Sequence, residues 1–215
     1  TVVIGNKPHT ISKTHITYQK VVDAIKAGDW DTVKDIIDPK KVVLNYGAGN
    51  VSIQGEQLFW KGKELNTGLA SRMIAMLQEG FPIEPMVNFM ENLMANPSKR
   101  AVDELYTFLE HKYLPLTEDG TFLAYKAVRA DYMDKYAGKF RNKVGDVCKM
   151  TRAKVDDNRG VGCSQGLHAG ALNYVASYGS LNNGDKIVIV KINPKDVVSV
   201  PTDCNCEKLR TCEYT

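Results

Sequence analysis

The sequence has no apolar run that approaches the roughly 18 residues required for a membrane-spanning helix, so we expect no such helix. Its apolar start is too short, and too quickly followed by polar residues, to form a secretory signal peptide. The net charge of only +3 does not by itself indicate a nucleic-acid partner. The sequence also lacks an initiator methionine and stops within a strand-like run, so we expect both ends to be trimmed. What remains is an ordinary globular composition, with 43% hydrophobic and 25% charged residues.

Cysteine is scarce, and its five occurrences form no recognisable metal-binding pattern. An odd number of cysteines without a signal peptide predicts reduced thiols in a cytosol. Cys204, Cys206 and Cys212 could supply three ligands and His168 a fourth, but their spacing lacks a paired Cys-x-x-Cys. Cys204 and Cys206 are instead expected to alternate along a strand. We therefore predict neither a metal nor another cofactor.

The order of helical and strand-like patterns predicts an α+β protein. Residues 1–14 are expected to form an extended arm, after which Gly28 provides a helix C-cap and Asp29 an N-cap, and Ser98 is expected to cap a later helix. A connector before residue 115 predicts two domains, 1–114 and 115–215. The elements expected in the first domain are helices over 17–27 and 30–37, a small meander of about four strands over 42–64, and a three-helix segment with helices over 68–80, 82–94 and 98–109.

The second domain is predicted to be mixed and β-rich. Strands are expected over 121–128, up to His168, and over 187–192, with one helix over 171–179. Lys126 shares its strand face with apolar residues, so it requires an anionic partner, either a ligand or an internal carboxylate.

His168 is the most informative residue of the second domain. It lies at a strand end, before a helix start, between glycines that loosen the backbone, and a ligand could sit there. A hydrogen-bonded structural histidine is the alternative, and it is the commoner role. The candidate ligand-binding residues are His168, Lys126, Tyr125, Gly166, Gly170 and Tyr174.

Residues 126–154 contain nine basic and three acidic residues, a local net charge of 9 − 3 = +6. Tyr132, Tyr136 and Phe140 lie among these charges, and basic segments with interleaved aromatic residues are typical of nucleic-acid binding. A solvated loop beside a hairpin has the same composition, and we favour that interpretation. The candidate nucleic-acid or anion contacts are Arg129, Lys139, Arg141 and Lys143. No catalytic set can be assigned from spacing, so we predict no catalytic residue.

Six short stretches distributed over most of the chain carry a resemblance to a known family. They are 79–82 (EGFP), 96–102 (NPSKRAV), 104–110 (ELYTFLE), 119–126 (DGTFLAYK), 166–170 (GLHAG) and 197–201 (VVSVP). Together they resemble the bacteriophage rIIB-like, or rapid-lysis, family. The resemblance implies a phage protein of the host cytoplasm, associated with lysis inhibition and with resistance to host exclusion systems. It also implies an rIIA-like partner at the inner membrane, where this chain would be at most peripheral.

A second and weaker resemblance concerns the C-terminal part alone. The order of its strands is similar to that of ADP-ribosyltransferase-like folds, which hold NAD near a histidine or arginine and often use a late glutamate. Glu207 and Glu213 are late glutamates, but neither lies in a recognisable toxin-type loop.

Three functions therefore remain open. We favour a non-enzymatic phage protein that binds a protein partner or its own copies. The alternatives are a nucleotide or signal-molecule binder, with ADP-ribosyltransferase-like catalysis as its enzymatic form, and nucleic-acid binding through residues 126–154. Association with the virion is left open.

Overall fold

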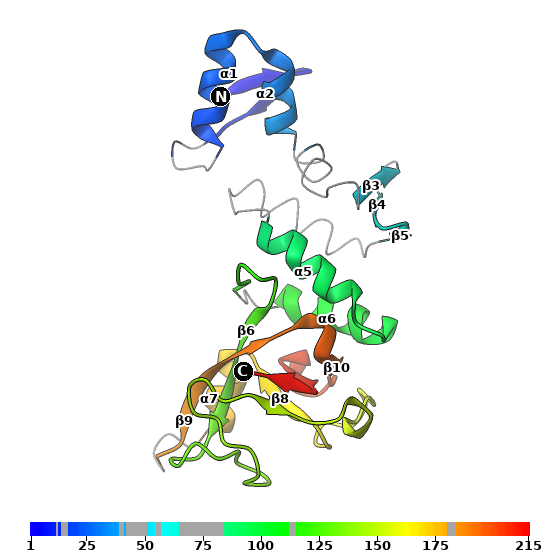
Figure 1. Cartoon of the computed structure of the whole chain (residues 1–215), viewed down its shortest axis with the longest axis vertical. Coiled ribbons are helices and arrows are strands. Elements are labelled where there is room, and N and C mark those ends of the chain that lie inside the picture. Colours follow the sequence, from blue (N-terminus) through cyan, green and yellow to red (C-terminus); the bar gives the residue numbers. More distant parts are fainter. Residues whose placement is uncertain are drawn as a thin grey trace. The chain divides into compact units, whose positions relative to one another are not determined.

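The computed structural model describes residues 1–11, 13, 17–38, 41, 51–54, 57–64, 84–111, 115–179 and 184–215. Within these residues the chain is an α+β protein, as predicted, with helices and several antiparallel sheets (Figure 1). It divides into two compact units, Thr1–Val87 and Asn88–Thr215. The domain boundary predicted between residues 114 and 115 stays a prediction.

A β-hairpin and two helices begin the first unit. The hairpin turns at Gly5 and Asn6, whose φ angles of 54° and 66° suit a two-residue turn, so this segment is not the extended arm expected from sequence. The two helices form as predicted: Gly28, with a φ of 71°, ends the first, and the Asp29 carboxylate accepts the Thr32 N–H to begin the second. These elements are β1 (Val2–Ile4), β2 (Lys7–His9), α1 (Tyr18–Ala27) and α2 (Trp30–Ile37).

A small apolar core holds the two helices together, with Val21 and Ala24 of α1 buried against Val33 and Ile37 of α2. Further along the chain, three antiparallel strands form most of the predicted meander. They are β3 (Val51–Gln54), β4 (Gln57–Trp60) and β5 (Lys63–Glu64). The strand predicted at 42–46 and the helix predicted over 68–80 lie outside the described residues.

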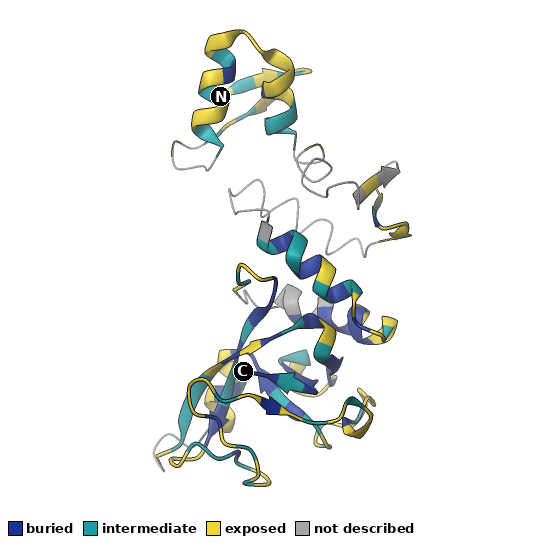
Figure 2. Cartoon of the chain, viewed as in Figure 1, coloured by how far each residue is buried: buried dark blue, intermediate teal, exposed yellow. Residues whose placement is uncertain are grey.

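Two helices, α5 (Glu84–Met94) and α6 (Lys99–His111), follow, close to the predicted bounds. Ser98 Oγ accepts the Ala101 N–H at 3.2 Å and caps α6, as its position predicted. The apolar positions of both helices are buried, which gives each helix one dark face in Figure 2. The side chains without any exposure are Met90, Leu93, Ala101, Leu105 and Phe108.

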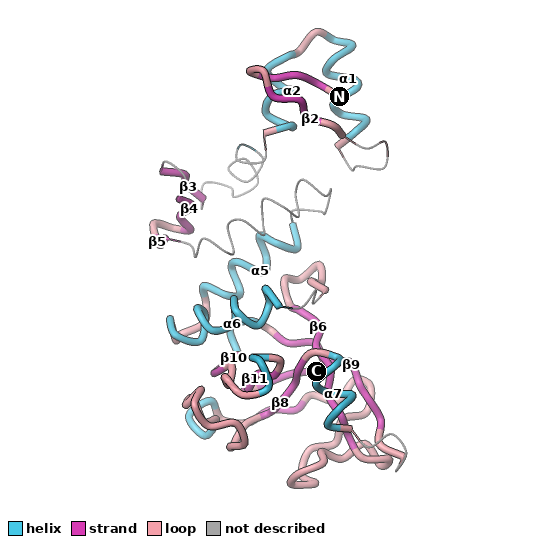
Figure 3. Tube along the Cα trace, turned by 180° about the vertical axis from the view of Figure 1, so that it is seen from behind, coloured by secondary structure: helices cyan, strands magenta, loops and turns pink. Residues whose placement is uncertain are grey.

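A five-stranded sheet forms the centre of the second unit, in the order β10-β11-β8-β6-β9, with every neighbouring pair antiparallel (Figures 1 and 3). A short two-stranded ladder of β7 and β12 accompanies it. The bounds are β6 (Phe122–Val128), β7 (Cys148–Lys149), β8 (Leu167–Gly170), β9 (Lys186–Ile192), β10 (Val197–Ser199), β11 (Lys208–Thr211) and β12 (Glu213–Tyr214).

Helices α6 and α7 (Leu172–Tyr178) cover opposite faces of this sheet. The ring of Phe122 in β6 lies 6.4 Å from the ring of Phe108 in α6. Ala127 of the same strand instead lies against Gly179 at the end of α7, where an added Cβ would come within 3.3 Å of the alanine Cβ. Because successive residues of a strand point to opposite faces, Phe122 and Ala127 mark the two covered sides.

The Asn96 side chain joins the helix pair to the sheet. Its amide donates to the carbonyls of Pro194 and Val197 at 2.9 and 2.8 Å, and its oxygen accepts from Arg152 Nη2 at 2.9 Å. Asn96 is buried, and these partners lie far away in sequence, so the turn between α5 and α6 is held by the C-terminal part of the chain.

Candidate functional site

Lys126 and His168 come together in the central sheet. Lys126 Nζ donates to the carbonyl oxygen of His168 at 2.8 Å and lies 5.5 Å from the centroid of the Tyr214 ring. Burial lowers the pKa of Lys126 to about 8, and the charge of Asp134 opposes this shift only in part. The hydrogen-bond acceptor of this lysine is therefore a backbone carbonyl, where the sequence indicated a ligand or a carboxylate.

The His168 imidazole is a hydrogen-bond acceptor. Its Nε2 atom accepts from Arg210 Nε at 3.3 Å, across the β8–β11 register that sets these two residues opposite each other. Burial lowers the pKa of His168 to about 4, and the nearby charges of Lys126, Arg210 and Lys208 lower it further. The ring is neutral at pH 7, and its Nε2 lone pair, which a general base would need, is used by Arg210.

Arg210 is the central residue of this cluster, and the sequence analysis missed it. Its side chain has no exposure, yet its guanidinium donates to one imidazole, one hydroxyl and several carbonyls. The carbonyls belong to the loop 156–162, which wraps around the guanidinium. These acceptors are Asp156 O at 3.0 Å, Asn158 O at 3.1 Å, Gly162 O at 3.4 Å and Val161 O. The only available signal was a basic residue within the strand-like run at the end of the sequence.

The two glycines of the predicted site are required by packing. An added Cβ at Gly166 would lie 3.0 Å from Val155 and 3.2 Å from Arg210. An added Cβ at Gly170 would lie 2.7 Å from both the Glu207 carbonyl and the Tyr174 ring. Gly170 also stands opposite Tyr125 in the β6–β8 pairing. The sheet therefore brings together four of the six predicted residues, namely Lys126, His168, Tyr125 and Gly170.

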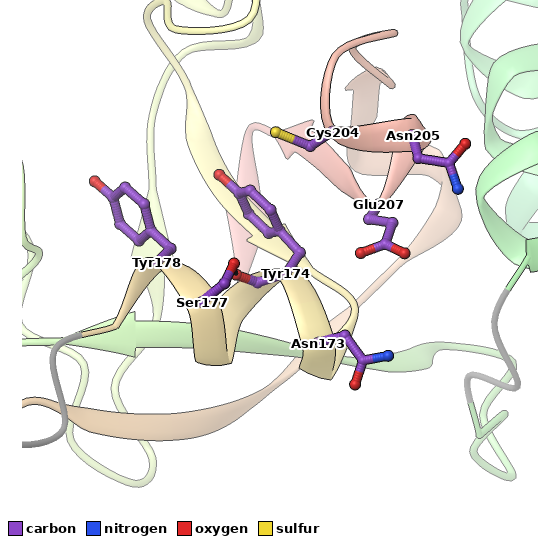
Figure 4. A pocket seen from close by; sticks show the side chains of 7 residues that line it. All are labelled: Asn173, Tyr174, Ser177, Tyr178, Cys204, Asn205 and Glu207. Carbon is purple, nitrogen blue, oxygen red and sulfur yellow. Dashed lines mark hydrogen bonds between the residues drawn. The ribbon is translucent and has the colours of Figure 1, made fainter.

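A shallow hollow of about 500 Å³ lies on the side of α7, and its lining contains Tyr174 but neither Lys126 nor His168 (Figure 4). The rings of Tyr174 and Tyr178 stack with their centroids 6.1 Å apart and an interplanar angle of 16°. Lys208 Nζ lies 5.8 Å from the Tyr174 ring, and Lys135 Nζ lies 5.3 Å from the Tyr178 ring. The other lining residues are Asn173, Ser177, Cys204, Asn205 and Glu207.

Cys204, Asn205 and Cys206 form a left-handed turn in the wall of this hollow, with φ angles of 49°, 54° and 56°. The expectation that the two cysteines alternate on a strand is therefore wrong. Three successive non-glycine residues in this region store backbone strain of about 1–2 kcal/mol each. No group of three His, Cys, Asp or Glu residues that could hold a metal ion occurs in the part of the chain that the structure describes.

Four of the nine basic side chains in residues 126–154 form ion pairs with acidic residues of the protein. Arg129 pairs with Asp131 at 2.6 Å, and Arg141 pairs with Asp146 at 2.9 Å. Asp134 accepts four backbone N–H groups, of residues 137–140, and so organises the loop between them. Of the four predicted anion contacts, Lys139 and Lys143 are exposed, and neither ammonium group forms a hydrogen bond or salt bridge with the described residues.

The low pKa of His168 makes stability depend on pH. Between pH 6.5 and 4 the unfolded chain binds a proton that the folded chain does not, so the contribution present above pH 6.5 is lost as the pH falls. We expect the loss to be about 2–3 kcal/mol across this window. Urea unfolding at a series of pH values should show a shallower dependence for His168→Gln, whose amide oxygen can still accept from Arg210. Equal slopes for both proteins would contradict the assignment.

The fold and the site define an α+β protein whose buried cations are bonded within the protein. A family model described as Bacteriophage T4 protein rIIB matches residues 7–215. The chain is 38% identical over 201 residues to protein rIIB of Enterobacteria phage T4, an alignment that covers 94% of this chain and 64% of that protein. This chain therefore belongs to the rIIB family of bacteriophage proteins, as the sequence stretches indicated.

No solved structure matches the chain. The weak similarity to ADP-ribosyltransferase-like folds thus stays a prediction. In the described ranges, no helix has the length and the apolar character needed to cross a membrane.

Proposed function

We propose that this chain is a non-enzymatic binding protein that acts in phage takeover of the host, in lysis timing or in resistance to host exclusion. It works by protein–protein assembly, with an rIIA-like protein, a host protein or its own copies. We place it in the host cytoplasm, at most peripherally at the inner membrane. The observation that supports this proposal is the internal use of the reactive groups: Lys126 and Arg210 donate to His168 and to backbone carbonyls.

An affinity-tagged chain expressed during infection tests this proposal. We expect a partner to be recovered after crosslinking and to survive in the variants Lys126→Met and His168→Gln, because these side chains face inward. Tyr136→Ser changes a large apolar side chain that is 98% exposed, and it should reduce recovery several-fold. Recovery of no partner, together with a monomeric chain, would contradict the proposal. So would a loss of binding confined to the Lys126→Met and His168→Gln variants.

A nucleotide or signal-molecule binder is the second candidate, and the hollow beside the stacked tyrosines favours it. Aromatic side chains stack on bases for about 1–3 kcal/mol per base. Thermal unfolding with a panel of NAD and cyclic nucleotides tests this candidate, because a bound ligand raises the melting temperature. The shift should disappear in Tyr174→Leu and persist in the control Tyr136→Leu. The absence of a shift across the panel would eliminate this candidate.

Nucleic-acid binding is the third candidate, supported by the exposed Lys139 and Lys143. Binding through these side chains must weaken as salt is added, because it releases counterions from the phosphates. Retention on DNA that does not change with salt, or that persists in a Lys139→Ala, Lys143→Ala double variant, would exclude this mode.

A further inference from the structure

Strand β9 is the most apolar of the described strands, and it forms the outer edge of the five-stranded sheet (Figures 1 and 3). Between Lys186 and Lys191 it contains only isoleucine and valine. An edge strand presents unpaired N–H and C=O groups, and native proteins usually cover such strands or interrupt them with charges. An apolar edge of this kind indicates a surface to which a further strand can add.

The hydrogen bonds of Lys191 show which backbone groups face outward. Lys191 N–H donates to Thr215 O at 2.7 Å, and Thr215 N–H donates to Lys191 O at 3.1 Å. These groups of Lys191 therefore point away from β6, although Lys191 stands opposite Leu123 of that strand. Hydrogen-bonded and non-hydrogen-bonded pairs alternate along antiparallel strands, so Ile187 and Ile189 also direct their backbone groups outward. Among the described residues, these outward groups have no backbone partner.

The lysines at the ends of the strand are engaged within the protein. Lys186 Nζ lies 3.8 Å from the centroid of the Tyr132 ring, and Lys191 Nζ lies 2.5 Å from Asp119 Oδ2. Neither charge therefore guards the edge in the way that edge lysines usually do. The side chain between them, Ile189, is 62% exposed.

We propose that β9 pairs with β9 of a second copy of this chain, in antiparallel orientation about a two-fold axis at Val188. Ile187 then stands opposite Ile189 of the second copy, and the symmetry repeats this pair on the other side of the axis. Each of the two pairs exchanges two hydrogen bonds, so the outward groups of both isoleucines are satisfied. The two sheets become one continuous sheet across the interface.

The sequence of the strand selects this register among the alternatives. It places apolar residues opposite apolar residues, and Lys186 opposite Val190 rather than opposite another lysine. A register centred on Ile189 would need the outward groups of Lys191, which Thr215 already uses, whereas pairing about Val188 ends at Lys186 and Val190 and leaves those groups with Thr215. The self-complementary pattern of the strand is what favours a second copy over an unrelated partner.

This inference rests on the proposed function, because it names one partner and one surface for the same assembly. The pairing of β9 and the proposed function can fail separately. A monomeric chain that still recovers a phage or host partner overturns the pairing of β9 and leaves the proposed function standing.

Ile189→Pro tests the pairing through the backbone. The Ile189 N–H is not used within the sheet, and proline is tolerated on an edge strand when its nitrogen faces outward. By light scattering, we expect a dimer for the unmodified chain and a monomer for Ile189→Pro, with unchanged circular dichroism. Val144→Pro, at the second position of the turn 143–146, is the matched control and should remain dimeric. A monomeric unmodified chain, or a dimer that survives Ile189→Pro, would overturn the proposal.

A cysteine at residue 188 tests the register itself, and it does so even where the proline variant does not fold. The Val188 pair across the axis is not hydrogen-bonded, with a Cα separation of about 4.5 Å, within the range that a disulfide spans. In a background with the exposed thiols removed (Cys163→Ser, Cys204→Ser), mild oxidation should convert Val188→Cys to a covalent dimer. Lys139→Cys, also exposed, should not crosslink. A dimeric protein in which Val188→Cys stays reduced would rule out this interface.

Discussion

Replacing Arg210 with methionine is expected to lower the free energy of unfolding by about 3–5 kcal/mol, among the largest effects of a single substitution in this chain. The guanidinium has no exposure, and the carbonyls of loop 156–162 have it as their common donor. Methionine fills the volume but donates nothing, so several carbonyls of the loop and the His168 ring lose their donor. Urea unfolding measured on the full chain gives the change directly.

Arg210→Lys separates charge from geometry. A lysine keeps the charge, but its three donors stand at a single point and cannot reproduce the planar fork of arginine. We therefore expect Arg210→Lys to lower the free energy of unfolding nearly as much as Arg210→Met. Hydrogen exchange across loop 156–162 should also become faster. Arg129→Met, which breaks an ion pair in which Arg129 is 48% exposed, is the control and should cost under about 1 kcal/mol. A lysine variant as stable as the parent would show that the charge, and not the set of hydrogen bonds, holds the loop.

Glu104→Ala is expected to lower the free energy of unfolding by about 2–4 kcal/mol. Glu104 lies on α6 with its side chain 1% exposed, and its Oε2 atom accepts the Val200 N–H at 2.9 Å. Its Oε1 atom has no hydrogen-bond donor among the described residues, although Arg100 Nε is 3.5 Å away. Alanine leaves the Val200 N–H buried without an acceptor and opens a cavity between the helix and the sheet.

The matched variant Glu104→Gln keeps an acceptor for Val200 and should lose less stability than alanine. Asp103→Ala, the exposed neighbour on the same helix, controls for helix propensity and should change stability by less than about 0.5 kcal/mol. Chemical denaturation of the three variants in parallel provides the comparison. If Glu104→Gln and Glu104→Ala lowered the free energy of unfolding equally, the stabilisation by Glu104 would come from its carboxylate charge near Arg100 rather than from its hydrogen bond to Val200.

The elements of this chain follow from local sequence. Gly28, Asp29 and Ser98 predicted where helices end and begin, because caps depend on side chains within three or four residues of the backbone groups they satisfy. The short stretches shared with the rIIB family indicate that family from the sequence alone, and the family comparisons confirm it. The hairpin at Gly5 and Asn6 was missed because its strands are only three residues long, although Gly-Asn is itself a signal for a two-residue hairpin turn.

The partners of the central charges could not be predicted from the sequence. The sequence indicated that Lys126 and His168 lie on strands, but not that one donates to the carbonyl of the other. It gave no sign that Arg210, 42 residues beyond His168, bonds to that imidazole and to the loop before it. It also placed Cys204 and Cys206 on a strand, where the close of the chain instead makes a left-handed turn.

The sequence by itself therefore determined the α+β class, the helix caps and the family of this protein. The tertiary structure alone decided that the basic residues of the sheet are bonded inside the protein, and that the most apolar strand lies at an edge. The physical reason is how far apart in the sequence the interacting groups lie. Caps and turns are set by neighbours in the chain, whereas strand order and buried hydrogen bonds join groups that only the folded chain brings together.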